Sequence, residues 1–189
     1  MSQLKIAIIK YGSGNLHSVQ KILEKFGALT TITDNPNDIA NSDVLVFPGQ
    51  GSNDTSMRQL REKNLVEPIR HHSMSGKYFL GICLGLQLLF ETSEEGIEPC
   101  LNLIPGKVHQ FPEDQKTPHM GWNKVTLTDS HPLFNGINSG EFFYFVHSYY
   151  AKPFESKIIL GTTTYGIKFS SVISVRNTIG VQFHPEKSG

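Results

Sequence analysis

Residues 78–90 read YFLGICLGLQLLF, and this stretch decides the expected fold. It opens as an apolar run of strand length and continues as an apolar run of helical character. Between the two runs, Cys83 lies between Gly81 and Gly85, which is the nucleophile-elbow pattern with sulfur in place of the serine oxygen. A strand that turns directly into a helix strains the nucleophile's backbone and leaves no room for neighbouring Cβ atoms. We therefore expect Cys83 at a helix N-terminus, where the dipole and free N–H groups favour a thiolate.

Cys83 has two interpretations, of which the first is a buried, inert cysteine between a core strand and a core helix. The second is a nucleophile, and residues 180–186 (GVQFHPE) favour it. There an apolar strand ends at His184, and the carboxylate of Glu186 follows two positions later. A cysteine nucleophile needs a base, and the base needs an acceptor that orients it. Because active sites of α/β proteins gather where strands end, we predict a Cys83–His184–Glu186 triad.

Residues 81–87 (GICLGLQ) and 184–186 (HPE) together resemble the class I, or triad, glutamine amidotransferases. Two further segments, 118–123 (PHMGWN) and 145–149 (FVHSY), narrow the resemblance to glutaminase subunits that act in histidine biosynthesis. The resemblance extends from about Lys5 to Gly189. It implies a three-layer, flavodoxin-like α/β fold with a mainly parallel sheet and added antiparallel strands. Cys83 is expected at the C-terminal edge of a central strand.

The resemblance also implies an activity and a partner. Glutamine would be hydrolysed to glutamate and ammonia, and the ammonia would pass to a synthase (cyclase) subunit of TIM-barrel fold in a heterodimer. No motif requires a metal or an organic cofactor. Two alternatives stay open: the glutaminase half of a paralogous sugar amidotransferase in surface-polysaccharide synthesis, and a catalytically silent interaction subunit. Lys10 and Gln50 support the former, since both depart from the family pattern near the face that meets a partner.

The same resemblance implies roles for residues outside the triad. The backbone N–H groups of Gln50 and Leu84 would form the oxyanion hole. Residues implied in glutamine binding are Gly49, Gly51, Gln87, Ser148 and Tyr149. Residues implied at the partner interface are Asn15, next to Gly14, and His119, Met120, Trp122, Tyr144 and Lys187.

Composition limits the class of protein. The 189 residues contain 17 Lys plus Arg and 17 Asp plus Glu, which argues against nucleic-acid or membrane-surface binding. Two cysteines are too few for a disulfide framework, and a reactive thiol implies a reducing compartment. The N-terminus has no signal-peptide pattern and no apolar run reaches membrane-spanning length, so we expect a cytoplasmic protein.

The remaining elements are predicted from periodicity and turn signals. We expect one domain over residues 1–189, which ends before the amphipathic helix with which family members continue. Buried parallel strands are predicted at 5–10, 28–33 and 43–47, a helix at 16–26, and a turn at 35–38. Helical material over 57–72 is expected to break near Asn64 and to end in solvated histidines, His71 and His72, which do not form a metal site.

The second half of the chain is expected to consist of strands. Six are predicted, near residues 107–111, 122–128, 141–150, 157–164, 168–176 and 179–183. Residues 176–178 are predicted to form a hairpin turn between the last two strands. In the helix after Cys83, Gln87 and Glu91 would lie one and two turns along and share its face.

Overall fold

A mixed eight-stranded sheet forms the centre of the computed structural model, which describes residues 3–12, 15–128 and 130–189. In spatial order its strands are β2 (Leu29–Thr33), β1 (Lys5–Ile9), β3 (Val44–Gly49), β4 (Tyr78–Cys83), β13 (Thr178–Val181), β12 (Ile167–Val175), β11 (Ile159–Tyr165) and β8 (Thr126–Leu127). The strands from β2 to β13 pair in parallel. The pairs β13–β12, β12–β11 and β11–β8 are antiparallel. The prediction of a parallel sheet with added antiparallel strands is therefore confirmed.

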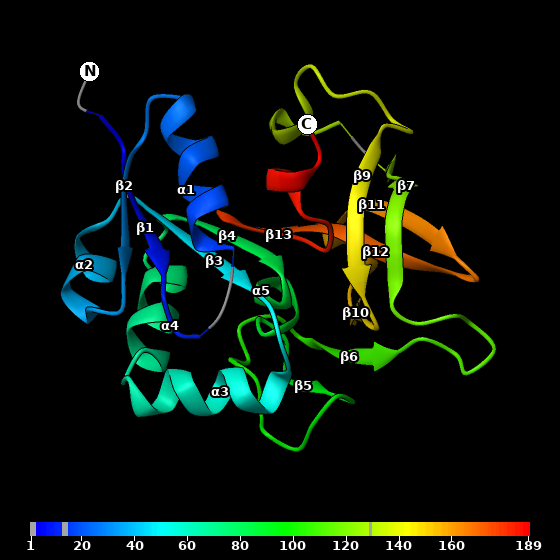
Figure 1. Ribbon diagram of the computed structural model, residues 1–189, viewed down its shortest axis with the longest axis horizontal. Helices are drawn as coiled ribbons and strands as arrows, with labels where there is room; N and C mark the ends of the chain where they lie inside the picture. The colour runs from blue at the N-terminus through cyan, green and yellow to red at the C-terminus, as the bar shows by residue number, and fades with distance from the viewer. Residues whose placement is uncertain (1–2, 13–14, 129) are drawn as a thin grey trace.

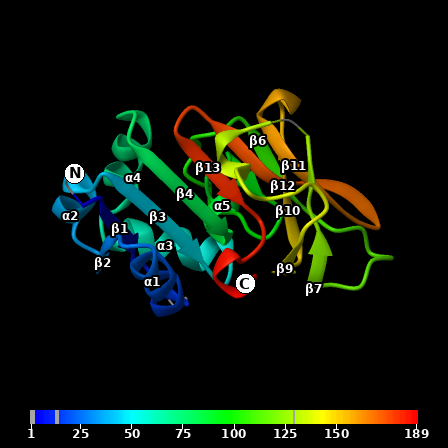
Figure 2. The same ribbon diagram turned by 90° about the horizontal axis from the view of Figure 1, so that it is seen from above.

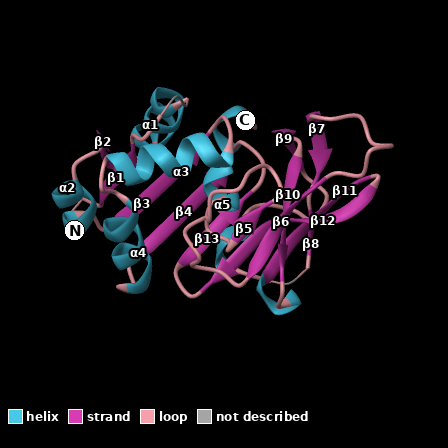
Figure 3. Cartoon of the chain, turned by 90° about the horizontal axis from the view of Figure 1, so that it is seen from below, coloured by secondary structure: helices cyan, strands magenta, loops and turns pink. Residues whose placement is uncertain are grey.

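Helices cover both faces of the parallel half of this sheet (Figures 1 and 3). On one face lies α1 (Leu16–Lys25), whose Val19 packs into a cluster with the β1 side chain Ile8. On the other face lie α2 (Pro36–Asn41), α3 (Asn53–Glu62), α4 (Val66–Met74) and α5 (Leu84–Gln87). Their apolar side chains pack against Ile9 and Phe47 of the sheet. This arrangement is the expected three-layer α/β fold.

Two smaller sheets stand beyond the carboxyl ends of the parallel strands. One contains β10 (Tyr149–Pro153), β6 (Gly106–Gln110) and β5 (Thr92–Ser93), and the other pairs β7 (His119–Lys124) with β9 (Phe142–His147). Short 3₁₀ helices are η1 (Pro132–Phe134), η2 (Ser156–Ile158) and η3 (Pro185–Lys187). Figure 2 shows β7 and β9 beside the carboxyl end of the chain. The N–H of His184 donates to the carbonyl of Tyr144 at 2.9 Å, which ties β9 to the segment after β13.

Several local predictions are confirmed. Asn64 has a φ of 55° and separates α3 from α4, as the expected helix break requires. Arg176 also has a positive φ, of 53°, in the two-residue turn between β12 and β13, where Val175 pairs with Thr178. The helix predicted at 16–26 is present as α1, and Gly27 follows it with a φ of 83°, the left-handed conformation typical of a helix C-terminus.

Residues 35–38 begin a helix, so the prediction of a simple turn is wrong. The Asn35 side-chain oxygen accepts the N–H of Asn37 at 2.9 Å, and Pro36 occupies the first turn of α2. This is an ordinary N-cap with proline at N1, and an isolated turn can begin with the same two residues.

The prediction that His72 is exposed to solvent is also wrong. His72 is only 2 % exposed, and its ring nitrogens lie against the carbonyls of Ile39 and Tyr78.

The helix after Cys83 is shorter than predicted, since α5 ends at Gln87. The carbonyls of residues 88–90 accept hydrogen bonds from the N–H groups of residues 101–104, which replaces a continued helical ladder. Every residue from 84 to 90 is buried, so this segment is enclosed on all sides and is not an amphipathic helix. Glu91 therefore does not share a helix face with Gln87 and Cys83.

Candidate active site

The backbone of Cys83 has the strained geometry of a nucleophile elbow. Its φ of 54° and ψ of −110° lie outside the regions that non-glycine residues ordinarily occupy. A Cβ at Gly85 would overlap the carbonyl oxygen of Phe47, and one at Gly81 would lie 2.8 Å from the carbonyl oxygen of Gly85. Both glycines are thus required for β4 to turn directly into α5, as the sequence predicts.

Strand register brings the chemical groups together. Gly49 at the end of β3 pairs with Cys83 at the end of β4, and Val181 at the end of β13 pairs with Ile82. Because these three neighbouring strands are parallel, their carboxyl ends meet at one edge of the sheet. Residues 49–51, Cys83 and His184 consequently line one hollow, although about a hundred residues separate the last two along the chain.

Two neighbours in and beside η3 hold His184, Glu186 through the ring and Ser188 through the backbone. Its Nδ1 lies 2.8 Å from Oε1 of Glu186, and the two side chains are only 3 and 4 % exposed. The hydroxyl of Ser188 donates to the His184 carbonyl at 2.6 Å and accepts the N–H of Tyr144 at 3.0 Å. The segment after β13 is therefore fixed from both sides, and Nε2 is the ring nitrogen left to face Cys83.

Charge at this position favours a protonated imidazole. Burial disfavours the cation, but the neighbouring Cys83 sulfur and the Glu186 carboxylate outweigh it and raise the pKa of His184 to about 9. Within the described residues, Nε2 of His184 is buried without a hydrogen-bond partner. The geometry therefore suits a thiolate–imidazolium pair in which Glu186 fixes the ring and its tautomer.

The hollow above Cys83 has a volume of about 460 Å³. Besides Cys83 and His184, it is lined by the residues predicted for the oxyanion hole and for glutamine, namely Gly49, Gln50, Gly51, Leu84, Gln87, Ser148 and Tyr149. Glu186 lies behind His184 and reaches the hollow only through that ring. A small polar molecule held here would lie within reach of both the thiol and the imidazole.

The residues predicted at a partner interface, apart from His119, fall into three groups. Tyr144 and Lys187 line the hollow, and the Lys187 ammonium lies 5.7 Å from the centre of the Tyr144 ring. Met120 and Trp122 are 63 and 56 % exposed on β7. Asn15 is partly exposed and accepts the Ser18 hydroxyl at 2.6 Å, whereas Gly14 lies outside the described residues.

His119 departs from the prediction, because its side chain is 3 % exposed and cannot contact a partner. Side chains alternate along β7, so Met120 and Trp122 point outward while His119 points inward. The His119 ring stacks on Tyr165, with ring centres 4.2 Å apart.

Two residues at or beside the hollow above Cys83 were not predicted from the sequence. Glu95 lines the hollow, and burial raises the pKa of its carboxyl group. Gln182 is fully buried, and its Nε2 lies 3.7 Å from the Cys83 sulfur. Gln182 could have been noticed as an amide in an otherwise apolar run. Glu95 had no such signal, because a loop carries it to the site.

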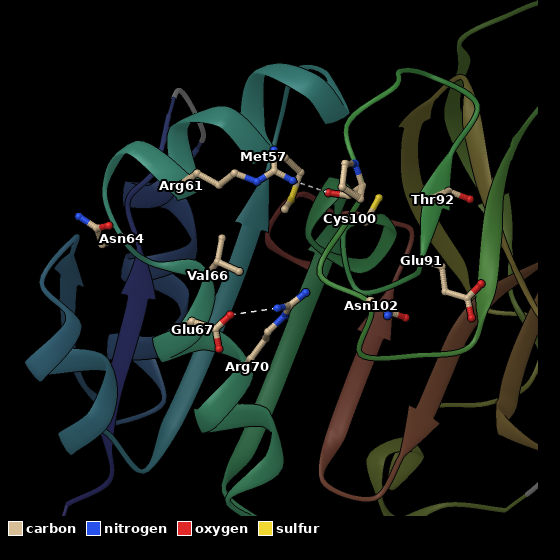
Figure 4. Close-up of a pocket in the computed structure, with 11 residues that line it drawn as sticks. Met57, Arg61, Asn64, Val66, Glu67, Arg70, Glu91, Thr92, Cys100 and Asn102 are labelled. Carbon is tan, nitrogen blue, oxygen red and sulfur yellow. Dashed lines mark hydrogen bonds and ion pairs between the residues drawn. The ribbon is translucent and has the colours of Figure 1, made fainter.

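A second, larger hollow of about 760 Å³ lies between α3, α4 and residues 91–102 (Figure 4). Arg61 donates to the carbonyl of Pro99 at 2.9 Å, and Arg70 donates to the carbonyl of Leu101 at 2.9 Å. Burial raises the pKa of the Cys100 thiol to about 12, so this sulfur stays protonated. The arginines thus hold a loop against the helices, and the hollow contains no activated nucleophile among its described lining residues.

The chain belongs to the class I glutamine amidotransferases, since the family model described as glutamine amidotransferase class-I matches residues 7–189. Curated relatives include the imidazole glycerol phosphate synthase subunit HisH of Moorella thermoacetica. It is 50 % identical over 184 residues, covering 97 % of this chain and 88 % of the relative. The HisH subunit of Syntrophotalea carbinolica is 49 % identical over 191 residues, covering 97 % of this chain and 93 % of the relative.

Solved structures support the same fold. A structure described as a glutamine amidotransferase matches with a TM-score of 0.75 at 15 % identity, covering 96 % of this chain and 90 % of that one. The structure of PurLQS from Thermotoga maritima matches with a TM-score of 0.73 at 17 % identity, covering 98 % of this chain and 89 % of that one. Throughout the described ranges, every helix is too short or too polar to cross a bilayer.

Proposed function

We propose that this chain is the glutaminase subunit of an imidazole glycerol phosphate synthase, acting in histidine biosynthesis. One observation carries the proposal: His184 is held by Glu186 at 2.8 Å and lines the same hollow as Cys83. Relatives 45 to 50 % identical over nearly the whole chain bear that subunit name. The triad geometry argues against a catalytically silent subunit, because a silent site would not need a buried, oriented imidazole.

The first half of the reaction forms a thioester. The Cys83 thiolate attacks the side-chain carbonyl carbon of glutamine, and the carbonyl electrons move onto oxygen. The backbone N–H groups of Gln50 and Leu84, both at the hollow, stabilise this oxyanion. The C–N bond then breaks as the His184 imidazolium protonates the departing nitrogen, which releases ammonia. A pKa of about 9 keeps His184 protonated at neutral pH for this step.

The second half releases glutamate. Neutral His184 takes a proton from water, and the resulting hydroxide attacks the thioester carbon. When the tetrahedral intermediate collapses, the C–S bond breaks and regenerates the Cys83 thiolate beside a protonated His184. Glu186 accepts the hydrogen bond from Nδ1 throughout and keeps that proton in place.

The polar end of β9 and the start of β10 suit the amino-acid end of glutamine. Ser148 and Tyr149 line the hollow with Cys83 and offer backbone and hydroxyl groups. The carboxylate of Glu95 lines the same hollow and complements an α-ammonium group. Gln87 donates to the Tyr149 carbonyl at 2.8 Å, so it also fixes the backbone that would hold the substrate.

The partner is a synthase subunit of TIM-barrel fold that docks over the hollow as a heterodimer. Exposed Met120 and Trp122, together with Tyr144 and Lys187 at the mouth, form a surface rich in the residue types that interfaces favour. Docking here would cover the exit of the hollow, so ammonia would reach the acceptor before solvent protonates it.

The test is a glutaminase assay of the chain alone and with the cyclase subunit of imidazole glycerol phosphate synthase. We expect glutamine-dependent synthesis of imidazole glycerol phosphate with that partner, and loss of this synthesis in Cys83→Ala. Synthesis supplied with ammonium salt should survive, since only the glutaminase half uses the thiol. Glutamine-dependent synthesis that persists in Cys83→Ala would overturn the assignment. Stimulation only by a sugar amidotransferase synthase would transfer the chain to the polysaccharide pathway.

A further inference from the structure

The sulfur of Cys83 has a buried neighbour to which the triad chemistry gives no role. Nε2 of Gln182 lies 3.7 Å from Sγ, and the carbonyl of Val146 lies 3.8 Å from it. The Val146 carbonyl can only accept a hydrogen bond, so it suits the protonated thiol. The Gln182 amide N–H can only donate a hydrogen bond, so it suits the thiolate. Gln182 is 0 % exposed, and no solvent can replace its donor.

The orientation of the Gln182 amide is fixed by Gln87. One N–H of Gln87 donates to the Tyr149 carbonyl at 2.8 Å, and the other faces Oε1 of Gln182 at 3.1 Å. Since both groups from Gln87 are donors, the oxygen of Gln182 must face Gln87. Its nitrogen then faces the sulfur.

A second donor reaches the same Tyr149 carbonyl. His147 Nδ1 lies 2.8 Å from this oxygen, so Nδ1 carries the proton and donates. His147 Nε2 lies 2.9 Å from His119 Nδ1, which makes Nε2 the acceptor and Nδ1 of His119 the donor. His119 Nε2 then accepts from the Asn123 amide at 3.1 Å.

This chain of donors cannot reverse while both rings stay neutral. Burial lowers the pKa of His119 to about 4 and that of His147 to about 3. Aromatic rings surround the pair: His119 stacks on Tyr165 and, at 4.9 Å between ring centres, on Phe145. A single tautomer of each ring satisfies the network, and a ring flip would place lone pairs against each other.

We propose that Gln182 is a positioning residue for the Cys83 sulfur and that Gln87 orients its amide. Gln87 and His147 both donate to the Tyr149 carbonyl, so this oxygen joins the Gln87–Gln182 pair to the hydrogen-bond chain from Asn123 through His119 and His147. The proposal rests on the proposed function only in that Cys83 is the nucleophile. Gln182 acts by holding the thiolate where it can attack and does not touch the substrate. The histidine chain begins on the inward face of β7, the strand whose outward side chains belong to the proposed docking surface, and it ends at the Tyr149 carbonyl.

The first test compares Gln182→Met with the unsubstituted chain. Methionine keeps the length of the side chain but removes the N–H donor. We expect the pH midpoint of Cys83 alkylation by iodoacetamide to rise by about one unit, since a hydrogen bond to a charged group contributes about tenfold. Peptide mass spectrometry separates Cys83 from Cys100. Thr178→Val is the matched control: it removes a buried hydroxyl from the preceding strand, 3.2 Å from Ser73 and away from the sulfur. An unchanged midpoint in Gln182→Met, or an equal shift in Thr178→Val, would overturn the proposal.

The second test is kinetic and uses the complex with the cyclase subunit. In Gln182→Met, kcat for glutamine hydrolysis should fall about tenfold while KM stays within about twofold, because the substrate contacts remain. A rise in KM at unchanged kcat would instead place Gln182 in substrate binding and sink the positioning role. An inactive unsubstituted complex would refute the proposed function, whereas the alkylation result would still decide the role of Gln182.

The third test needs no substitution, so it holds even if Gln182→Met does not fold. Nitrogen-15 NMR of the histidine rings reports tautomer and protonation directly. We expect His119 and His147 to be neutral with the proton on Nδ1 at about pH 6, where an ordinary histidine is mostly charged. A proton on Nε2 of either ring, or titration of either ring near about pH 6.5, would overturn the part of the proposal in which the two histidines fix the Tyr149 carbonyl.

Discussion

Nδ1 of His184 lies 2.8 Å from Oε1 of Glu186, and both side chains are almost fully buried in the segment that follows β13. In the proposed mechanism the pair divides two tasks, since the ring moves protons while the carboxylate only orients it. We therefore expect His184→Asn to lower the glutaminase rate by on the order of a hundredfold to ten-thousandfold, the usual range for a lost general acid–base. Glu186→Gln should retain more activity, because His184 can still titrate.

Steady-state glutaminase assays with the cyclase subunit bound would measure both variants. Circular dichroism and thermal melting of each variant serve as the control for folding, since Glu186 is buried. If Glu186→Gln were the slower of the two while folded, the ranking and the division of tasks would be wrong.

The buried pair of His119 and His147 predicts a particular dependence of stability on pH. In the folded chain their pKa values are lowered by burial, to about 4 and about 3. In the unfolded chain both titrate near about 6.5. Below that pH these two histidines bind more protons in the unfolded state, so their contribution to the free energy of unfolding falls as pH drops from about 6.5 towards about 4. At about pH 5 the loss is about 2 kcal/mol for each ring.

Urea unfolding at about pH 7.5, 6 and 5 would measure this slope. His119→Gln should make the dependence of the free energy of unfolding on pH shallower by the contribution of one histidine. This holds whatever the substitution does to stability at the highest pH. His17→Gln is the matched control, because His17 is exposed on α1 and should leave the slope unchanged. Equal slopes in the unsubstituted chain and in His119→Gln would contradict the neutral, buried pair.

Trp122 offers a direct probe of docking, because it is the single tryptophan of the sequence and is 56 % exposed. Burial by the synthase subunit should shift its fluorescence emission to shorter wavelength. Trp122→Ala should raise the Kd of the heterodimer at least about tenfold, as truncation of a central interface aromatic typically does. Ile97→Ala is the control, since Ile97 is 94 % exposed but sits near Asp54 of α3, on another side of the molecule. Equal effects of the two changes would exclude β7 from the interface.

Local sequence signals predicted the elbow and the pairing of His184 with Glu186 because each depends on neighbours along the chain. The glycines around Cys83 are a steric requirement of one turn, and His184 and Glu186 are two residues apart. The hairpin at Arg176 and the break at Asn64 were equally local. The same local signals could not distinguish a proline turn from the first turn of α2, since an asparagine followed by a proline occurs in both.

Burial and contacts between distant segments could not be read from the sequence. His119 lies in a motif that suggested an interface, but strand alternation turns it inward among aromatic rings. The short α5 results from hydrogen bonds to residues 101–104, which no periodicity reveals. Glu95 reaches the hollow on a loop whose path is set by tertiary packing. Such features depend on which segments meet, and they required the structure.

Gln50 allows the oxyanion hole itself to be tested. Its position lines the hollow next to Gly51, whose φ of 101° only glycine adopts without strain. The Gln50 side chain is exposed, and the proposed mechanism uses its backbone N–H as the donor to the oxyanion, so the side chain should be dispensable. We expect the isolated chain to be nearly inactive and docking to raise its glutaminase rate at least about tenfold, by aiming this N–H into the hollow. A tenfold change corresponds to about 1.4 kcal/mol of barrier, less than the several kcal/mol attributed to one oxyanion donor.

Two substitutions separate the backbone of this loop from its side chain. Gln50→Val should keep the stimulated rate within a few fold, because the N–H donor remains. Gly51→Val, which forces a β-branched side chain into the positive-φ position, should lower that rate much more. Glutaminase assays of the unsubstituted chain and both variants, alone and saturated with the cyclase subunit and its acceptor, distinguish these outcomes. Full activity of the unsubstituted chain in isolation would mean that docking does not complete the oxyanion hole.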